Sequence, residues 1–250
     1  MVRRKPFQGV FNIVRFNWHF YLLAILGIVL ISITNTFLPI GIQIVVSSSI
    51  FIVAFTTILS LLVSYYIYDV SDLYKLEFAG EVGNEKLLNI NAGFDEISEI
   101  IMGKMTNSDL TICDFYDEEK HTEISIKRAR KAYPPKSRII SVESHYLPFF
   151  DNNFDKIFAM LSAHEIRDEQ ERILFFRELN RIIKPNGEIF VIEHLRDKFN
   201  FLAYTIGFLH FYSRKNWVRT FSKANLILKN EIKITPFITV FILKKDGITN

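Results

Sequence analysis

The stretch EQERILFFRELNRIIKPNGEIFVIEH, residues 169–194, decides the fold because it joins a helix directly to a buried strand. Apolar residues recur at helical spacing from about residue 169 to 183, and Asp168 stands where a helix N-cap is expected. The KPNG that follows, at 184–187, predicts a helix stop and a tight turn, since Pro cannot continue a helix and Asn-Gly favours turns. The chain then reverses into a strand at 188–194.

Short apolar runs alternate with helical patterns through the rest of the second part of the chain. Further strands are predicted at 86–89, 110–113, 138–142 and 154–161, an order typical of a parallel sheet with helices on both faces. The last two runs, 226–234 and 237–244, are separated only by Thr235-Pro236 and must form a hairpin. We therefore predict an α/β fold: a Rossmann-like, mostly parallel seven-stranded sheet ending in an antiparallel hairpin.

The first third of the chain is different in composition. Residues 20–68 contain no Asp, Glu, Lys, Arg or His, although charged residues make up 23% of the chain. One membrane crossing needs about 20 apolar residues, so this stretch predicts two transmembrane helices joined by a turn near 35–41, where Pro39 and Gly41 interrupt the pattern. A cleavable signal peptide has a shorter apolar region, and two adjacent charge-free helices are unusual in the core of a small soluble domain.

We thus expect a basic N-terminal flank at 1–19, a transmembrane helical hairpin at 20–68 and an enzyme-like domain at 69–250. The flank carries four basic residues, which the positive-inside rule places in the cytoplasm: Arg3, Arg4, Lys5 and Arg15. Two crossings return the chain to the same side. The sequence therefore predicts an integral protein of the inner or cytoplasmic membrane, with the N-terminus and the C-terminal domain both cytoplasmic.

Charge and cysteine content exclude some classes of partner. The whole chain is +3 and the flank alone has four positive charges, so the remainder is close to neutral and no nucleic-acid partner is expected. The single Cys113 allows no intramolecular disulfide and no Cys-rich metal set. No metal site is predicted.

Two segments carry a family resemblance. Residues 147–157, LPFFDNNFDKI, resemble the L-P-F-x-D-x-x-F-D-x-V segment of class I S-adenosylmethionine-dependent methyltransferases, and residues 178–187, ELNRIIKPNG, resemble their E-x-x-R-x-L-K-P-G-G segment. Their order and spacing, with the terminal hairpin, extend the resemblance over most of residues 68–245, as in a type 11-like methyltransferase domain. It implies S-adenosyl-L-methionine as cofactor and methyl transfer as the reaction.

The glycine-rich cofactor loop of that family is altered here. Where the family has D-x-G-x-G, this chain has NINAGFD at 89–95. The resemblance assigns cofactor binding to Asn89, Asn91 and Gly93, and Asn91 tolerates the positive φ that such a turn needs. Asp95 would repel the cofactor carboxylate, cap the following helix or meet the cofactor's ammonium group. A plain strand-to-helix turn is the alternative.

Two further positions follow the second and third strands. Asp114 lies about twenty residues beyond Gly93, where dinucleotide-type folds commonly place an acid against the ribose; the alternative is a surface acid. Glu143 and Ser144 match the family pair whose carboxylate reaches the adenine amino group. An NAD-binding fold fits less well, because no G-x-G-x-x-G occurs near Gly93.

Candidate catalytic residues follow the fourth and fifth strands. His164 and Glu165, after the fourth strand, and His194, at the end of the fifth, stand at the strand edge where open α/β sheets bind ligands. Each is a candidate to remove a proton from a hydroxyl acceptor. A structural hydrogen-bonding role is open for all three, and many relatives transfer methyl groups by positioning alone.

The acceptor side is suggested by the aromatic stretch at 199–212. It predicts either an insert packed on the sheet or an interfacial helix or apolar pocket near the membrane. We expect a small or lipophilic acceptor, such as a lipid or a quinone-like molecule. The alternative is a catalytically inactive methyltransferase-fold module that binds or regulates at the membrane, suggested by Asn91 and Asp95 at glycine positions. A purely membrane-assembly role has less support, and the sequence leaves the oligomeric state open.

Overall fold

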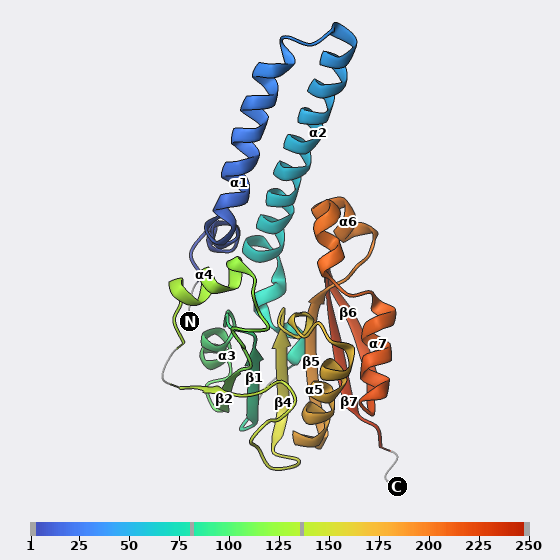
Figure 1. The fold of residues 1–250 in the computed structure, drawn as a ribbon. Coiled ribbons are helices and arrows are strands. Elements are labelled where there is room, and N and C mark those ends of the chain that lie inside the picture. Colours follow the sequence, from blue (N-terminus) through green and yellow to red (C-terminus); the bar gives the residue numbers. More distant parts are fainter. Residues whose placement is uncertain (1–3, 81–82, 136–137, 248–250) are drawn as a thin grey trace.

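The fold is an α/β domain from which two long antiparallel helices project (Figure 1). This computed structural model describes residues 4–80, 83–135 and 138–247. Seven strands form one sheet in the order β3-β2-β1-β4-β5-β7-β6. Strands β1 to β5 pair in parallel, and β7 is antiparallel to both β5 and β6. The predicted fold class, with its terminal hairpin, is confirmed.

The strands are β1 (Lys86–Asn91), β2 (Asp109–Asp114), β3 (Ile139–Ser141), β4 (Phe154–Met160), β5 (Ile183–His194), β6 (Leu226–Thr235) and β7 (Ile238–Lys245). The α-helices are α1 (Gln8–Asn35), α2 (Ile40–Tyr65), α3 (Ser98–Lys104), α4 (Ile124–Ala132), α5 (Glu169–Ile182), α6 (Lys198–Tyr204) and α7 (Arg214–Lys223). The short helical turns are η1 (Tyr66–Val70), η2 (Asp72–Lys75), η3 (Glu77–Ala79), η4 (Ala163–Glu165) and η5 (Thr205–His210).

In the segment 169–194, which decides the fold, the helix begins as predicted, but the connection between the helix and the strand differs from the prediction. Asp168 caps α5 by accepting the N–H of Glu171 at 2.8 Å. The tight turn predicted at 184–187 is wrong: these residues stay within β5 as a bulge, between the pairs Phe154–Ile183 and Lys156–Glu188. An ion pair of 2.7 Å between Lys184 and Asp155 holds the bulged segment against β4, and the chain passes from α5 at Ile182 into β5 at Ile183 without a separate turn element.

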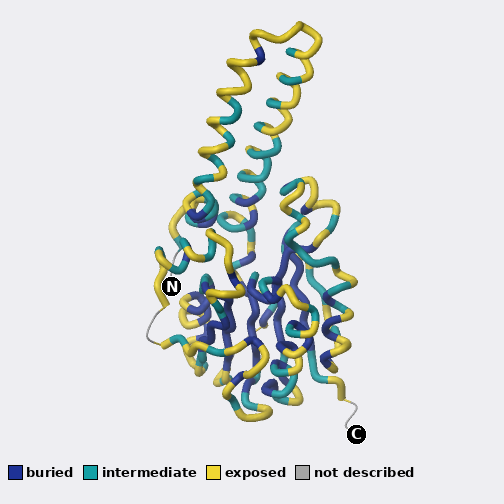
Figure 2. Tube along the Cα trace, viewed as in Figure 1, coloured by how far each residue is buried: buried dark blue, intermediate teal, exposed yellow. Residues whose placement is uncertain are grey.

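Apolar side chains cover both faces of the sheet because alternate residues of each strand point to opposite sides. On one face, Leu88 and Ile90 of β1 pack with the buried aromatics of α5 and α7. On the other face, Leu87 packs with α3 and with the turns η1 to η3. The buried residues are concentrated in the strands, whereas α1 and α2 are mostly exposed along their length (Figure 2).

The two long helices meet the requirements of the predicted membrane hairpin. Both are long and apolar enough to cross a bilayer, and in the most apolar part of each almost no residue is buried. Pro39 is the N-cap of α2, within the turn predicted at 35–41. Helix α1 starts at Gln8 rather than near residue 20, so most of the predicted basic flank is helical. Arg3, part of that flank, lies outside the described residues.

The early start of α1 has a physical cause in the segment that follows α2. The Asp69 carboxylate in η1 accepts the N–H groups of Gly9 at 2.7 Å and Val10 at 2.9 Å, which caps the first turn of α1. A Cβ on Gly9 would lie 2.4 Å from the Cβ of Tyr68. Only glycine therefore allows α1 to approach η1 this closely.

The segment after α2 is also part of the core of the domain. Ile67 and Leu73 are fully buried in the same apolar cluster as β1, β4, β5 and β7. Helix α2 ends at Tyr65 and η1 begins at Tyr66, so the long helix continues into the domain without a linker.

Leu73→Ala tests this integration. We expect it to lower the free energy of unfolding of the whole chain in detergent by about 2–5 kcal/mol, since it leaves a cavity in the shared core. Leu174→Ala on the exposed side of α5 is the matched control and should change the same quantity by no more than about 0.5 kcal/mol. Equal effects of the two substitutions in denaturant unfolding would show that η2 is not part of the core.

Candidate functional site

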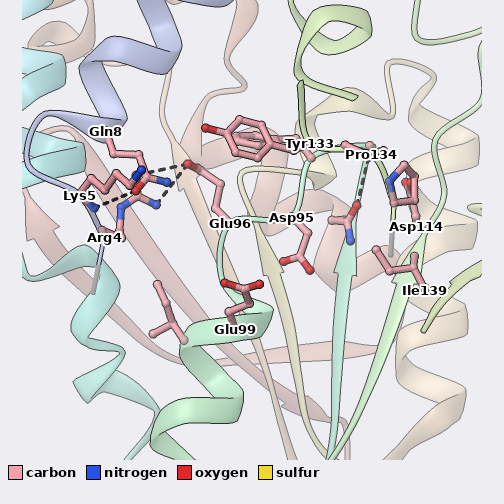
Figure 3. Close-up of a pocket in the computed structure, with 15 residues that line it drawn as sticks. Arg4, Lys5, Gln8, Asp95, Glu96, Glu99, Asp114, Tyr133, Pro134 and Ile139 are labelled. Atoms are coloured by element: carbon pink, nitrogen blue, oxygen red, sulfur yellow. Dashed lines mark hydrogen bonds and ion pairs between the residues drawn. The ribbon is translucent and has the colours of Figure 1, made fainter. Parts of the chain in front are cut away.

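The carboxyl ends of β1 and β2 open into a cavity of about 260 Å³ (Figure 3). The loop after β1, Asp114 at the end of β2, and Tyr133 after α4 form its domain side. Residues ahead of and within the first turn of α1 close the other side: Arg4, Lys5 and Gln8. The predicted cofactor loop and Asp114 therefore do meet in one cavity, and the N-terminal segment forms part of its wall.

The loop keeps the shape of a glycine turn despite its altered sequence. Gly93 has φ of +96°, a conformation that side-chain-bearing residues rarely adopt. The Asn91 side chain accepts the N–H of Gly93 at 3.2 Å and donates to the carbonyl of Cys113 at 2.9 Å, so it ties the turn to β2. Asn89, buried in β1, donates to Asp95 and to Ser98. The side-chain hydrogen bonds of Asn91 and Asn89 thus hold the loop in this conformation.

Asp95 caps the helix that follows, which was one of the three roles left open by the sequence. Its carboxylate accepts the N–H groups of Ile97 at 3.2 Å and Ser98 at 3.0 Å, at the start of α3. The neighbouring Glu96 pairs with Arg4 at 3.3 Å and accepts the Tyr74 hydroxyl at 3.0 Å. Burial raises the pKa of Glu96, and the Arg4 charge opposes that shift. The backbone N–H groups at the start of α3 are therefore already bonded to the carboxylate of Asp95.

Asp114 is buried and has two partners. Its carboxylate accepts the N–H of Tyr116 at 2.9 Å and forms an ion pair with Arg130 of α4. The Arg130 guanidinium also lies over the Tyr116 ring, 4.2 Å from its centroid. A Cβ on Gly93 would lie 2.9 Å from the Tyr116 ring and 3.2 Å from Arg130. These two side chains thus cover Gly93 on the side to which a Cβ would point.

Glu143 and Ser144 are not brought to this cavity. Both line a separate, open hollow of about 780 Å³ on the other side of Tyr116. Glu143 is exposed and pairs with His145 at 3.0 Å, and Ser144 donates to Glu171 of α5. Their predicted contact with the adenine stays a prediction, and it requires a ligand that extends past Tyr116 from one hollow into the other.

His164 and Glu165 form a charged cluster at the end of β4. His164 Nδ1 lies 2.7 Å from Oε2 of Glu193, and its Nε2 lies 3.2 Å from Oε1 of Glu165. Burial alone would lower the pKa of His164, but the two carboxylates outweigh it and raise the pKa to about 10. Burial would raise the pKa of Glu165, yet its hydrogen bonds to His164 and His210 bring the pKa below its ordinary range. Both groups are therefore charged at neutral pH.

A smaller cavity of about 100 Å³ joins this cluster to the loop after β1. Asn89, Asn91, Phe94 and Asp95 line it from one side, and Glu165 lines it from the other. Among the candidate catalytic residues, Glu165 is thus the one placed on a cavity wall facing the loop.

His194 is placed differently from the other two candidates. Its Nε2 lies 2.8 Å from the Tyr68 hydroxyl, and its Nδ1 lies 3.0 Å from the Asn200 side-chain oxygen and 3.1 Å from the Phe237 carbonyl. Its ring stacks on Phe211 with centroids 4.6 Å apart. Burial lowers the pKa of His194 to about 4. Both nitrogens are therefore engaged: Nε2 ties β5 to the segment after α2, and Nδ1 ties it to α6 and to the turn between β6 and β7.

Several residues of the site have no local sequence signal. Arg130 lies on the helix between β2 and β3, and Arg4 lies more than 90 residues from its partner Glu96. His210 reaches Glu165 at 3.7 Å from the aromatic stretch. Glu193 is the neighbour of His194 in β5, and strand alternation points its side chain to the other face, where it contacts His164.

Comparison with known proteins places the fold. Residues 104–191 match the family described as methyltransferase domain. The demethylmenaquinone methyltransferase of Thermotoga maritima is 28% identical over 143 residues, which cover 57% of each chain. The uncharacterised protein YafE of Escherichia coli is 30% identical over 137 residues, covering 47% of this chain and 60% of YafE. The chain therefore spans less than two thirds of the length of these curated relatives.

Solved structures match a larger part of the chain. A SAM-dependent methyltransferase from Aquifex aeolicus superposes with a TM-score of 0.53 at 14% identity, over 75% of this chain and 97% of that one. The PH0226 protein of Pyrococcus horikoshii superposes with a TM-score of 0.52 at 15% identity, over 69% and 87%. At these identities the likeness establishes the shared fold.

The buried His194 predicts a loss of stability in mild acid. Its pKa of about 4 in the folded chain lies below the ordinary 6.5, so below pH 6.5 the unfolded chain binds the proton first. The free energy of unfolding should fall as the pH drops from 6.5 towards 4, by on the order of 3 kcal/mol from this group. His194→Gln, measured in denaturant unfolding across that range, should show a shallower slope. An unchanged slope would contradict burial of a neutral imidazole.

Proposed function

We propose that this chain, whose second part is a methyltransferase domain of the class I fold, is a membrane-anchored S-adenosylmethionine-dependent methyltransferase with a lipophilic acceptor. The observation that carries the proposal is the meeting of the loop after β1 and Asp114 in one cavity, at the carboxyl edge of a sheet ordered β3-β2-β1-β4-β5-β7-β6. Ligands of open α/β sheets bind at this edge.

The residues of the cavity fit the cofactor in their chemistry. Asp114 offers a carboxylate to the ribose hydroxyls, and the Asn91–Gly93 turn supplies the close backbone approach that the methionine part requires. Pockets that bind drug-sized ligands measure about 300–1,000 Å³, so the cavity of about 260 Å³ must widen to hold the cofactor. Arg130 and Tyr116 are partly exposed side chains, and their rotation away from Gly93 gives the needed space.

The cofactor, when bound, supplies an electrophilic methyl group, and the protein's contribution is mainly positioning. The loop after β1 and Asp114 would hold the donor. Glu165 borders the small cavity on the opposite side, where its carboxylate can accept a hydrogen bond from an acceptor hydroxyl and orient it. His164, held by Glu193, fixes Glu165 in place. We assign His194 a structural role, since both of its nitrogens are engaged.

A lipophilic acceptor is supported by the surface beside the long helices. Helix α6 and turn η5 expose large apolar side chains: Phe199, Phe201, Leu202, Ile206 and Leu209. Ala203, Tyr204 and Thr205 of the same segment share a hollow with Tyr21 of α1 and Thr56 of α2, so this apolar tip lies beside the helical hairpin (Figure 1). A bilayer around the hairpin would cover the tip, and the site beneath it would face the lipid.

The relative named demethylmenaquinone methyltransferase favours a quinone-like acceptor within this class. Arg4, Lys5 and Arg15 at the start of α1 favour a cytoplasmic location for the domain. An acceptor dissolved in the same bilayer as the anchor would reach the site by lateral diffusion.

A second candidate function is a methyltransferase-fold module that binds or regulates without turnover. Its support is the covered loop: Arg130 and Tyr116 occupy the face of Gly93, and Asp95 occupies the start of α3. A module of this kind would keep the fold and leave the cavity closed to the cofactor.

Calorimetric titration of S-adenosylmethionine and of its demethylated product into the full chain in detergent separates the two functions. We expect binding of both ligands, and a weakening of about 10–100-fold in Asp114→Asn, which loses hydrogen bonds to a charged acceptor. Arg130→Ala should bind more tightly than wild type, because it frees Asp114 and the face of Gly93. Absence of heat from wild type and from Arg130→Ala, both shown to be folded, would favour the non-catalytic module.

The position of the apolar tip is tested with a fluorescent label. Ile206→Cys adds an exposed thiol to a chain whose single Cys113 is buried. An environment-sensitive dye at position 206 should shift to the blue when the chain is moved from a short-chain detergent into lipid nanodiscs. The same dye on Phe150→Cys, an exposed position just ahead of β4 at the amino edge of the sheet, away from the hairpin (Figure 1), is the control and should not shift. Equal spectra at the two positions would place the tip in water.

A further inference from the structure

Two histidines and a carboxylate converge at the ends of β4 and η5, beside the proposed methyl-transfer site. Ligand atoms of His164, Glu165 and His210 all lie within 4.8 Å of one another. We propose that these three side chains bind one divalent transition-metal ion, and that Zn²⁺ suits them best. The role given to the ion below rests on the proposed function, but its binding does not. The sequence did not anticipate such a site.

The spacing of the three side chains matches a tetrahedral ion. Oε1 of Glu165 lies 3.2 Å from Nε2 of His164 and 3.7 Å from Nε2 of His210. Ligands of tetrahedral Zn²⁺ at 2.0–2.1 Å from the ion are about 3.4 Å apart. The centroids of two imidazoles on such an ion are about 5.2 Å apart by the same geometry, and those of His164 and His210 are 5.3 Å apart.

Glu193 supplies the support that a metal-binding histidine needs. It is fully buried, and its carboxylate takes both the ring Nδ1 of His164, at 2.7 Å, and the backbone N–H of His164, at 3.2 Å. A histidine that donates one ring N–H to a carboxylate presents the lone pair of its other nitrogen in a fixed direction. The Nε2 of His164 is thereby aimed at Glu165 and His210.

The charges around the cluster also favour a cation. Glu165 and Glu193 face His164, and Glu123 lies 3.3 Å from His210 Nδ1. Arg167 opposes these three carboxylates: it donates to the His210 carbonyl at 2.7 Å, and its guanidinium lies against both ring nitrogens of His210, from which it must move when an ion binds. Arg167 is half-exposed and lies 3.8 Å from Glu123, so it can pair with Glu123 when an ion takes the ring nitrogen. A divalent ion would then balance the two remaining carboxylates.

Three protein ligands leave one coordination position open, as in catalytic rather than structural zinc sites. Glu165 lines the small cavity shared with Asn89 and Asp95, so the open position faces the space between the loop after β1 and the cluster. An oxygen atom of the acceptor would fit there, which deepens the proposed substrate class: a lipophilic molecule that carries a hydroxyl or carbonyl oxygen.

The test is metal binding by the full chain in detergent, produced without a polyhistidine tag. The protein is stripped with a chelator, dialysed and titrated with Zn²⁺, and the Zn²⁺ content per chain is measured. Co²⁺ is then used as a spectroscopic probe. We expect one Zn²⁺ per chain and the intense visible bands of tetrahedral Co²⁺.

Variants locate the site. His210→Gln changes a half-exposed ligand and should weaken Zn²⁺ binding at least about tenfold and remove the Co²⁺ bands. Glu193→Gln should weaken binding by about 10–100-fold through the orientation of His164. His145→Gln is the matched control, since His145 pairs with Glu143 at the surface in the same way; it should bind as wild type does.

A folded wild-type chain that takes up no Zn²⁺, or a His210→Gln variant that binds as wild type does, would overturn the proposal. The measurement needs no methyl donor, so its result is independent of the proposed function. Zn²⁺ uptake without S-adenosylmethionine binding would contradict the proposed methyltransferase function and would still support the metal site.

Discussion

The burial of the segment after α2 beneath the sheet is the constraint on which the rest of the structure depends. Ile67 and Leu73 are fully buried in one cluster with β1, β4, β5 and β7, and Tyr68 bonds to His194 at 2.8 Å across 126 residues of chain. Asp69 in the same segment caps α1. The helical hairpin and the sheet therefore share one core rather than being joined by a tether.

This shared core explains why the N-terminal residues take part in the site. Once α1 is docked on η1, Arg4 reaches Glu96 and Phe16 packs on Phe94 with ring centroids 5.6 Å apart. The Phe16 carbonyl also accepts Arg128 of α4 at 2.7 Å, which places the helix carrying Arg130 over Asp114. The cavity at the strand ends is thus formed by both parts of the chain.

The sequence predicts most of the fold, because its signals are local. Alternating apolar runs define the strands, the two-residue gap before β7 requires a hairpin, and the charge-free stretch 20–68 marks the long helices. The bulge at 184–187 departed from the expected turn because the pairing of Lys184 with Asp155 on β4 is a tertiary contact. The site was harder to predict from the sequence because it also depends on tertiary contacts. Asn91, Gly93 and Asp114 follow from strand-end positions, whereas Arg130 and His210 reach the site through helix and turn packing that no local pattern encodes.

Helix α2 runs directly into η1 at Tyr65 and Tyr66, so in the proposed membrane-anchored enzyme this junction would fix how far the domain stands from the lipid. A domain on a flexible tether samples many heights above a membrane, and its effective concentration at any one depth falls as the tether lengthens. In the proposed enzyme the distance from the membrane surface to the strand ends would be set by rigid helix geometry, so the site would select acceptors by the depth of their reactive atom. Among otherwise similar bilayer molecules, those whose reactive atom lies at that depth would be methylated. A longer or shorter polar head would move the reactive atom away from that depth, and such molecules would not be methylated.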